Sequence, residues 1–307
     1  MAIKHYSSPR WSYEITDCSM PMSFDTYSNC SFGCVYCFSG YQKGVSGNSA
    51  AYFAKECNPV NVAKVKAMFT DPDKHAGQFA WYIKKRHVMQ WGGLADGFDQ
   101  NEKERGASLD LLRFFRGIDY PISISTKGVW FVDDARYREV ITGYRNSHWK
   151  ISIITADADK ARHVEKGCPP PSERFRAMAA LKDMGVGAVT LRLRPFIIGL
   201  TDKTLDNLIE SAGQAGAYSV STEFFCLEKR ANEQVRARYA ELSAVLGFDV
   251  FAYYRRNSYS GSGLLRLNYE LKRPHITRLQ QLCDRHGLKL FVSDAHHKDK
   301  SQIGRAH

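Results

Sequence analysis

The chain has 307 residues, of which 44% are hydrophobic, enough for one large domain or for a domain with an appended module. No apolar run approaches the roughly 20 residues that a membrane-spanning helix needs, and residues 1–13 lack the apolar core of a secretory signal. We therefore predict a cytoplasmic protein with no membrane partner. Eight cysteines without a regular framework also suit a reducing compartment, where tight cysteine clusters usually bind metal.

The chain is strongly basic, with a formal net charge of +11 and a sequence pI of about 9.2. Much of the basic excess lies in the last quarter, after Lys229. A polyanionic partner is therefore expected, either nucleic acid or a nucleotide. A solvated basic surface is the alternative, because basic character alone does not identify a ligand.

The predicted elements alternate between strand and helix along most of the chain, which indicates a parallel sheet with helices on its outer face. Asp133 or Asp134 is suited to cap a helix by accepting free backbone amides, and Ser172 and Gly185 are suited to begin and end the next one. The predicted helices are 60–69, 107–115, 134–145, 172–185 and 201–215. The predicted strands are 22–27, 86–90, 121–126, 150–155, 189–198 and 218–225.

Six strand and helix units predict an α/β fold, namely a partial (β/α)6 TIM-like barrel. We expect the barrel to span residues 1–226 and a smaller, basic C-terminal extension to span residues 227–307. The extension is predicted to contain a Ser- and Gly-rich loop at 256–263, with His296 and His297 in a polar tail where disorder is expected. Its predicted helices are 232–246 and 274–286, and a short strand is predicted at 288–293.

Three cysteines stand close together after the first predicted strand. Cys30, Cys34 and Cys37 are separated by three and then two residues, a spacing that lets three thiolates hold one iron–sulfur cluster and leaves one corner without a protein ligand. A zinc site is the main alternative, although Cys18 and Cys57, the nearest candidates for a fourth ligand, are not at a customary zinc spacing. A disulfide would leave one of the three thiols over.

This spacing, with Tyr36 directly before the last cysteine, resembles the signature of the radical S-adenosylmethionine (SAM) superfamily. The resemblance implies a [4Fe-4S] cluster whose unique iron is chelated by SAM, and an electron donor such as flavodoxin or ferredoxin. Segments 95–102, 124–128, 168–175, 181–185 and 194–202 are similar, in the same order, to spore photoproduct lyase-like proteins of the DNA repair photolyase type. The sequence departs from them at Gly97, where proline is usual.

The resemblance also implies residues that bind the cofactor. Tyr36 would pack on the adenine or cluster side, and Gly92 and Gly93 would receive the SAM amino group through backbone oxygen, although Leu94 replaces the usual acid. Lys127 would pair with the SAM carboxylate, and Ser152, facing inward from the fourth strand, would hydrogen-bond the same group. Each of these residues also has an ordinary structural interpretation, as a buried tyrosine or a lysine at a strand end.

Four further residues are the main candidates for catalysis. Asp96, Glu102 and Glu223 are acids at strand ends facing the expected cavity, where they would bind substrate or transfer protons. Cys226 is a candidate hydrogen donor, as are Cys57 and Cys168, although small buried cysteines are common. In spore photoproduct lyase the donor is a cysteine between the second and third strands; residues 58–121 contain none, so strict photoproduct-lyase chemistry is not expected.

These observations predict a radical SAM enzyme that takes hydrogen from a nucleic-acid base or nucleotide, in DNA lesion repair or base modification. A radical SAM enzyme acting on a small molecule or a peptide, for example in an isomerisation, is the second hypothesis, because a fold does not determine a substrate. A non-enzymatic protein that binds metal through the cysteines is the third.

Overall fold

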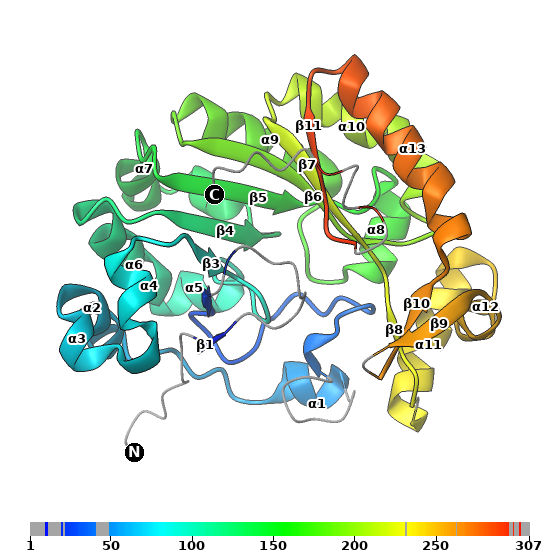
Figure 1. The fold of residues 1–307 in the computed structure, drawn as a ribbon, viewed down its shortest axis with the longest axis horizontal. Helices are drawn as coiled ribbons and strands as arrows, with labels where there is room; N and C mark the ends of the chain where they lie inside the picture. The colour runs from blue at the N-terminus through cyan, green and yellow to red at the C-terminus, as the bar shows by residue number, and fades with distance from the viewer. Residues whose placement is uncertain are drawn as a thin grey trace.

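The computed structural model describes residues 10–11, 20, 22–40, 49–230, 232–261, 263–294, 297 and 301. An eight-stranded sheet organises the chain in the order β1-β2-β3-β4-β5-β6-β7-β11 (Figure 1). Neighbours from β2 to β11 pair in parallel, and only β1 is antiparallel, against β2. The strands are β1 Arg10–Trp11, β2 Met22–Phe24, β3 Met89–Trp91, β4 Ile122–Thr126, β5 Ser147–Ser152, β6 Ala188–Phe196, β7 Ser219–Phe224 and β11 Lys289–Val292.

Helices cover the outer face of this curved sheet (Figure 1). The prediction of a partial TIM-like barrel with six strand and helix units is confirmed for β2 to β7, and β11 adds a further parallel strand. None of the described helices is long and apolar enough to cross a membrane. The helices are α1 Ser49–Ala54, α2 Val62–Thr70, α3 Pro72–His75, α4 Ala80–Lys84, α5 Gln100–Arg105, α6 Ala107–Gly117, α7 Ala135–Ile141, α8 Ala158–Val164, α9 Pro171–Asp183, α10 Leu205–Gln214, α11 Glu233–Leu246, α12 Val250–Asn257 and α13 Tyr269–Arg285, with short 3-10 turns at Gly77–Phe79, Trp130–Val132 and Asp202–Thr204.

The strands alternate between an apolar outer row and a polar inner row. On β5, Trp149 and Ile151 are fully buried against the helices, while Lys150 and Ser152 point to the other face, as strand geometry requires. Phe131 of the segment before α7 stacks on Trp149, with ring centroids 5.0 Å apart. The outer row builds the hydrophobic core, which leaves the polar inner row free to line a ligand site.

A second, three-stranded sheet, in the order β8-β10-β9, lies beside the barrel with α11 and α12 (Figure 1). Its strands are β8 Leu227–Glu228, β9 Ser258–Gly261 and β10 Leu264–Leu267. The predicted loop at 256–263 is wrong here, because β9 pairs with β10 over four residue pairs. The domain boundary predicted after residue 226 stays a prediction, although β11, from beyond that boundary, is hydrogen-bonded to β7.

Several other boundaries differ from the prediction, among them those of β5 and α13. Strand β5 begins at Ser147, three residues before the predicted start, because the polar residues at its beginning still pair with β4. Helix α13 begins at Tyr269, so Pro274, predicted as the first helical residue, lies inside it. His296 and the possible zinc ligand Cys18 lie outside the described residues, whereas His297 lies within them and stacks on Tyr269.

Candidate cofactor and substrate site

A cavity of about 310 Å³ lies at the carboxyl ends of the barrel strands, the usual place for ligands in such folds. Its volume is in the range of small-molecule sites. The cysteine loop forms one wall of the cavity and the strand ends form the back. A further wall comes from β8 and β10 of the C-terminal sheet. Eleven of the twelve residues predicted for the site line it: Cys30, Cys34, Tyr36, Cys37, Gly92, Gly93, Asp96, Lys127, Ser152, Glu223 and Cys226.

The cysteine loop is held by backbone hydrogen bonds from several elements. The Ser31 amide donates to Asp99 Oδ2 (2.5 Å), the Val35 amide donates to the Val164 carbonyl (2.9 Å), and the Cys37 amide donates to the Cys34 carbonyl (3.1 Å). These protein contacts hold the loop with all three thiols on the cavity wall.

The spread of the thiols bears on the kind of metal site. A tetrahedral zinc ion with zinc–sulfur bonds of about 2.3 Å needs ligand atoms about 3.8 Å apart. Within the described part of the chain, the group of possible ligand atoms lying within 4.8 Å of one another is Cys34, Glu165 and Cys168, and it includes neither Cys30 nor Cys37. The three motif thiols share one wall of the cavity without all lying within 4.8 Å of one another, a spread that a polynuclear cluster accommodates.

Glu165 is already occupied by protein partners. Its carboxylate accepts hydrogen bonds from the Tyr36 hydroxyl and from Arg174 Nη2 (2.5 Å), and both Glu165 and Arg174 are buried. Burial opposes ionisation of Glu165, but Arg174 and Lys127 outweigh it and hold the pKa of Glu165 below its ordinary value. This buried ion pair orients Tyr36 inside the cysteine motif.

Lys127 lies over the Tyr36 ring, with Nζ 5.7 Å from the ring centroid. Burial alone would lower the pKa of Lys127, but the neighbouring acidic groups of Cys34, Glu165 and Cys168 raise it above its ordinary value. Lys127 is therefore a charged ammonium at neutral pH, suited to bind a carboxylate at the cavity wall.

Gly92 follows β3 with φ of +86°, and a Cβ atom there would lie 2.3 Å from the Ser125 carbonyl oxygen. Only glycine fits at this position. Asp96, a few residues later, accepts hydrogen bonds from Thr126 Oγ1 (2.6 Å) and the Lys127 amide (2.7 Å). Burial raises the pKa of Asp96 to about 6 in spite of these bonds. Asp96 thus joins the glycine loop to the end of β4.

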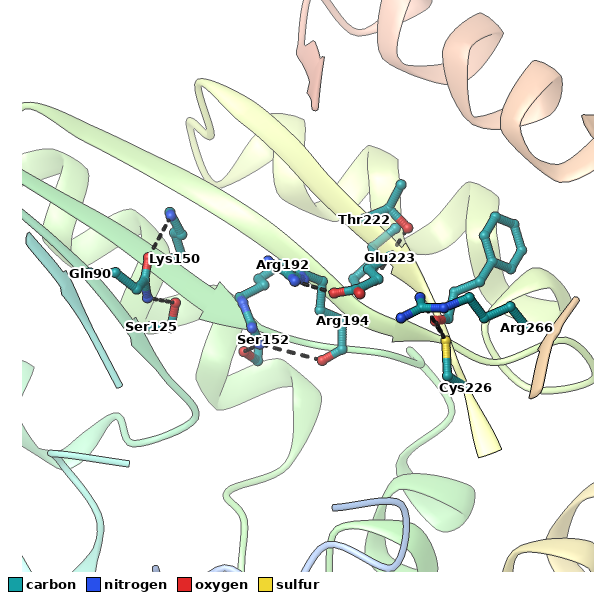
Figure 2. A network of polar contacts seen from close by, with 12 residues as sticks. Gln90, Ser125, Lys150, Ser152, Arg192, Arg194, Thr222, Glu223, Cys226 and Arg266 are labelled. Atoms are coloured by element: carbon teal, nitrogen blue, oxygen red, sulfur yellow. Dashed lines mark hydrogen bonds and ion pairs between the residues drawn. The ribbon is translucent and has the colours of Figure 1, made fainter. Parts of the chain in front are cut away.

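Charged and polar side chains form the back wall of the cavity (Figure 2). Arg192 and Arg194 project from β6 into the cavity; Arg194 pairs with Glu223 of β7, and Arg192 Nη1 lies 3.4 Å from Ser152 Oγ. Sequence reasoning missed both arginines. The signal was present in Leu191-Arg192-Leu193-Arg194, since a strand with a buried outer face turns every second residue inward.

The C-terminal sheet closes the far end of the cavity. Arg266 of β10 donates from Nη1 to Cys226 Sγ (3.5 Å), and burial raises the pKa of Cys226 to about 12. Arg238 of α11 is buried and links this region to the cysteine loop. Its Nη1 donates to the Cys37 carbonyl (2.5 Å), and its Nη2 donates to both carboxylate oxygens of Glu228 (2.9 and 3.0 Å).

No protein-family model matches the sequence, and no curated protein matches it either. Among solved structures, the chain is similar to a cysteine-to-serine variant of spore photoproduct lyase, with a TM-score of 0.68 and 14% identity over 95% of this chain and 80% of that one. It is also similar to spore photoproduct lyase complexed with dinucleoside spore photoproduct, with a TM-score of 0.66 and 15% identity over 95% of this chain and 79% of that one.

A third similar structure is Streptococcus suis SuiB bound to S-adenosylmethionine, with a TM-score of 0.54 and 10% identity over 91% of this chain and 52% of that one. At these identities the likeness establishes the fold. This chain has the fold of spore photoproduct lyase. The structural match covers 95% of the chain, so it includes most of the C-terminal quarter, which the sequence resemblance did not cover.

The structure places Glu102 outside the cavity wall, contrary to the expectation from its sequence position. Its carboxylate accepts hydrogen bonds from the hydroxyls of Tyr27 and Tyr137 (2.5 Å for Tyr137) and from the amides of Ser108 and Leu109 (both 2.8 Å). Glu102 is fully enclosed by these partners at the start of α6, where a carboxylate stabilises free helical amides. Glu102 therefore stabilises the start of α6 and does not contact the cavity.

Cys57 and Cys168, the other candidate hydrogen donors, do not line the cavity. Cys57 is buried in a small cluster with Tyr27 and Ala107. Cys168 Sγ lies 3.8 Å from Cys34 Sγ, behind the wall formed by the motif. Of the three thiols outside the motif that were considered as donors, Cys226 is the one that faces the cavity.

Proposed function

We propose that this protein is a radical SAM enzyme in which Cys30, Cys34 and Cys37 bind a [4Fe-4S] cluster and the cavity binds SAM and a nucleic-acid base or nucleotide. The observation that carries the proposal is the convergence of the three motif thiols on a cavity that also holds Lys127 and the glycine loop. The fold, shared with structures bound to S-adenosylmethionine, supports it.

When bound, the cluster and SAM would supply reductive cleavage of SAM to a 5′-deoxyadenosyl radical, which takes a hydrogen atom from the substrate. The protein positions the reactants. Lys127 would pair with the SAM carboxylate, Ser152 and Arg192 would hydrogen-bond the same group, and the Gly92 and Gly93 backbone would accept from the SAM amino group. Tyr36, held by Glu165, restricts the space beside the cluster.

Residues at the other end of the cavity would handle the substrate. Glu223 is held by its ion pair with Arg194 beside the substrate space, and Asp96, whose pKa is raised to about 6, is suited to exchange a proton near neutral pH. Cys226 is the thiol placed to act as a hydrogen donor. We assign the substrate to nucleic acid or nucleotides because the chain is strongly basic and spore photoproduct lyase is solved with a dinucleoside photoproduct.

The test uses protein reconstituted with iron and sulfide without oxygen. Incubation with SAM and dithionite should release 5′-deoxyadenosine, and single-stranded DNA or nucleotides should increase the rate. The variant C34A should release none, whereas C57A, which alters a buried cysteine away from the cavity, should retain activity. Zinc as the bound metal, or an intact cluster that never cleaves SAM, would refute the enzyme. SAM cleavage that no nucleic acid or nucleotide affects would refute the substrate class.

A radical SAM enzyme acting on a small molecule or peptide is the second candidate, and one observation favours it. The cavity has a volume of about 310 Å³, near the lower end of the range for small-molecule sites, and is walled by the C-terminal sheet as well as the barrel. Such a site suits a compact substrate that is enclosed during the reaction. Stimulation of SAM cleavage by a metabolite pool cleared of nucleotides, but not by DNA, would select this candidate. The cytoplasmic location and the flavodoxin or ferredoxin electron donor remain predictions.

A further inference from the structure

Strand β10 carries one charged side chain into the cavity from outside the barrel. Leu265 and Leu267 are buried on one face of the strand, so Leu264 and Arg266 turn to the opposite face, and both line the cavity. Pairing of Leu264 with Glu228 and of Leu265 with Leu227 fixes this register. A shift of one residue would turn Arg266 away from the cavity.

Arg266 has a different kind of partner from three other arginines in or near the cavity. Arg194 pairs with Glu223, Arg174 with Glu165 and Arg238 with Glu228. Among the described residues, Arg266 forms no ion pair, and its hydrogen bond goes to the neutral thiol of Cys226. A cationic group partly removed from water is stabilised only when it has an anionic partner.

The acids near Arg266 are already engaged. Glu223 is paired with Arg194, and Asp294, which lies close enough to influence Cys226, is paired with Lys272 (2.6 Å). Figure 2 shows Arg266 extending from β10 toward the ends of β6 and β7, where it meets Cys226. A negative group entering the β10 end of the cavity would therefore meet a guanidinium, that of Arg266, which no described carboxylate neutralises.

We propose that Arg266 binds the phosphate group of the substrate, so that the β8-β10-β9 sheet supplies substrate recognition to the barrel. This inference rests on the proposed function for its choice of a phosphate ester over a carboxylate. Arginine offers a planar fork of N–H donors that matches phosphate oxygens in pairs, and its charge does not vary with pH. The phosphate would lie beside Cys226, and the base would extend toward the strand ends.

Isothermal titration calorimetry on the reconstituted protein tests this directly. The probes are the four 2′-deoxynucleoside 5′-monophosphates, the matching nucleosides, and nucleoside 5′-carboxylic acids. We expect at least one nucleotide to bind about tenfold to a hundredfold more tightly than its nucleoside, the usual effect of a hydrogen bond to a charged group. A short single-stranded oligonucleotide of the same base then distinguishes a free nucleotide from nucleic acid as the source of the phosphate.

Variants of Arg266 locate the effect. R266Q should remove the preference for nucleotide over nucleoside, and R266K should restore part of it, because lysine keeps the charge without the fork. R256Q removes an equal charge from the exposed face of the neighbouring helix α12 and should leave the preference intact. Thermal unfolding of each variant checks that it is folded, and the comparison of nucleotide with nucleoside in the unmodified protein needs no variant.

Each outcome decides between the two proposals. If nucleotides bind no better than nucleosides, if carboxylates bind as tightly as phosphates, or if R256Q acts like R266Q, the phosphate site is wrong even where 5′-deoxyadenosine is still formed. If the preference depends on Arg266 but the protein never cleaves SAM, the phosphate site stands and the proposed chemistry fails.

Discussion

The arginines near the cysteine loop and the arginine of β10 differ in whether a carboxylate among the described residues neutralises them. Around the cysteine loop, Arg174 is paired with Glu165, and Arg238, which donates to the loop at the Cys37 carbonyl, is paired with Glu228 of β8; all four side chains are almost fully buried. At the β10 end, Arg266 is half-buried and contacts a thiol. A loop that must hold a cofactor in a fixed geometry benefits from complete internal pairing. An end that must exchange ligands benefits from a charge that only the ligand satisfies.

The largest effect is expected where a buried pair at the cysteine-loop end is broken. R174M removes the hydrogen bonds to Glu165 (2.5 Å) and to the Ser152 carbonyl (2.8 Å), and leaves the buried Glu165 carboxylate without its ion-pair partner. We expect a loss of about 3–5 kcal/mol in the free energy of unfolding, measured by urea denaturation. R176M, on the same helix, breaks an exposed pair with Asp133 and should cost less than about 1 kcal/mol. Equal losses would mean that the buried pairing has no special weight.

The second prediction concerns the connection between α11 and the cysteine loop. R238Q leaves the Cys37 carbonyl and the Glu228 carboxylate without their buried donor. We expect a loss of about 1–3 kcal/mol in the free energy of unfolding and a lower iron content after anaerobic reconstitution. R236Q alters an exposed arginine of the same helix and should bind the same iron as the unmodified protein. Full iron content in R238Q would show that the loop does not depend on α11.

The cysteine-loop side of the cavity is built from loops that follow barrel strands, and the β10 side comes from the C-terminal sheet. This difference explains which parts of the site the sequence could predict. The cysteine loop, the glycines and Lys127 follow strands that are visible as short apolar segments, and parallel strands bring their carboxyl ends together. Their convergence was therefore predictable from element order. The partial barrel was predictable for the same reason, with boundaries displaced where polar residues such as Ser147 still pair in the sheet.

The charge partners were not predictable, because they join segments far apart in the chain. Arg238 contacts a carbonyl 201 residues away, and Arg266 meets a thiol 40 residues away. Nothing local distinguishes these arginines from others in a basic segment. Glu102 illustrates the opposite error: its place after a strand end suggested a cavity acid, but α5 and α6 turn it toward the helix amides.

The third prediction uses the pH dependence of Asp96. Burial raises its pKa from an ordinary 3.8 to about 6, so between these values the folded state holds a proton that the unfolded state has lost. Stability should therefore fall as pH rises from about 4 to about 6 and should be level above that. Between pH 5 and pH 7 the unmodified protein should lose about 1 kcal/mol relative to D96N, in urea unfolding at each pH. Parallel curves for the two proteins would contradict the assigned shift.

The smallest change in stability is expected at the β10 end, and it completes the comparison. R266Q removes a cation that has no carboxylate partner among the described residues, so the free energy of unfolding without ligand should change by no more than about 0.5 kcal/mol. A nucleotide at about one hundred times its dissociation constant should stabilise the unmodified protein by about 2.7 kcal/mol, and the same concentration should stabilise R266Q much less. A large loss in R266Q without ligand would place Arg266 with Arg174 and Arg238 among the structural arginines, because the fold itself would then need its charge.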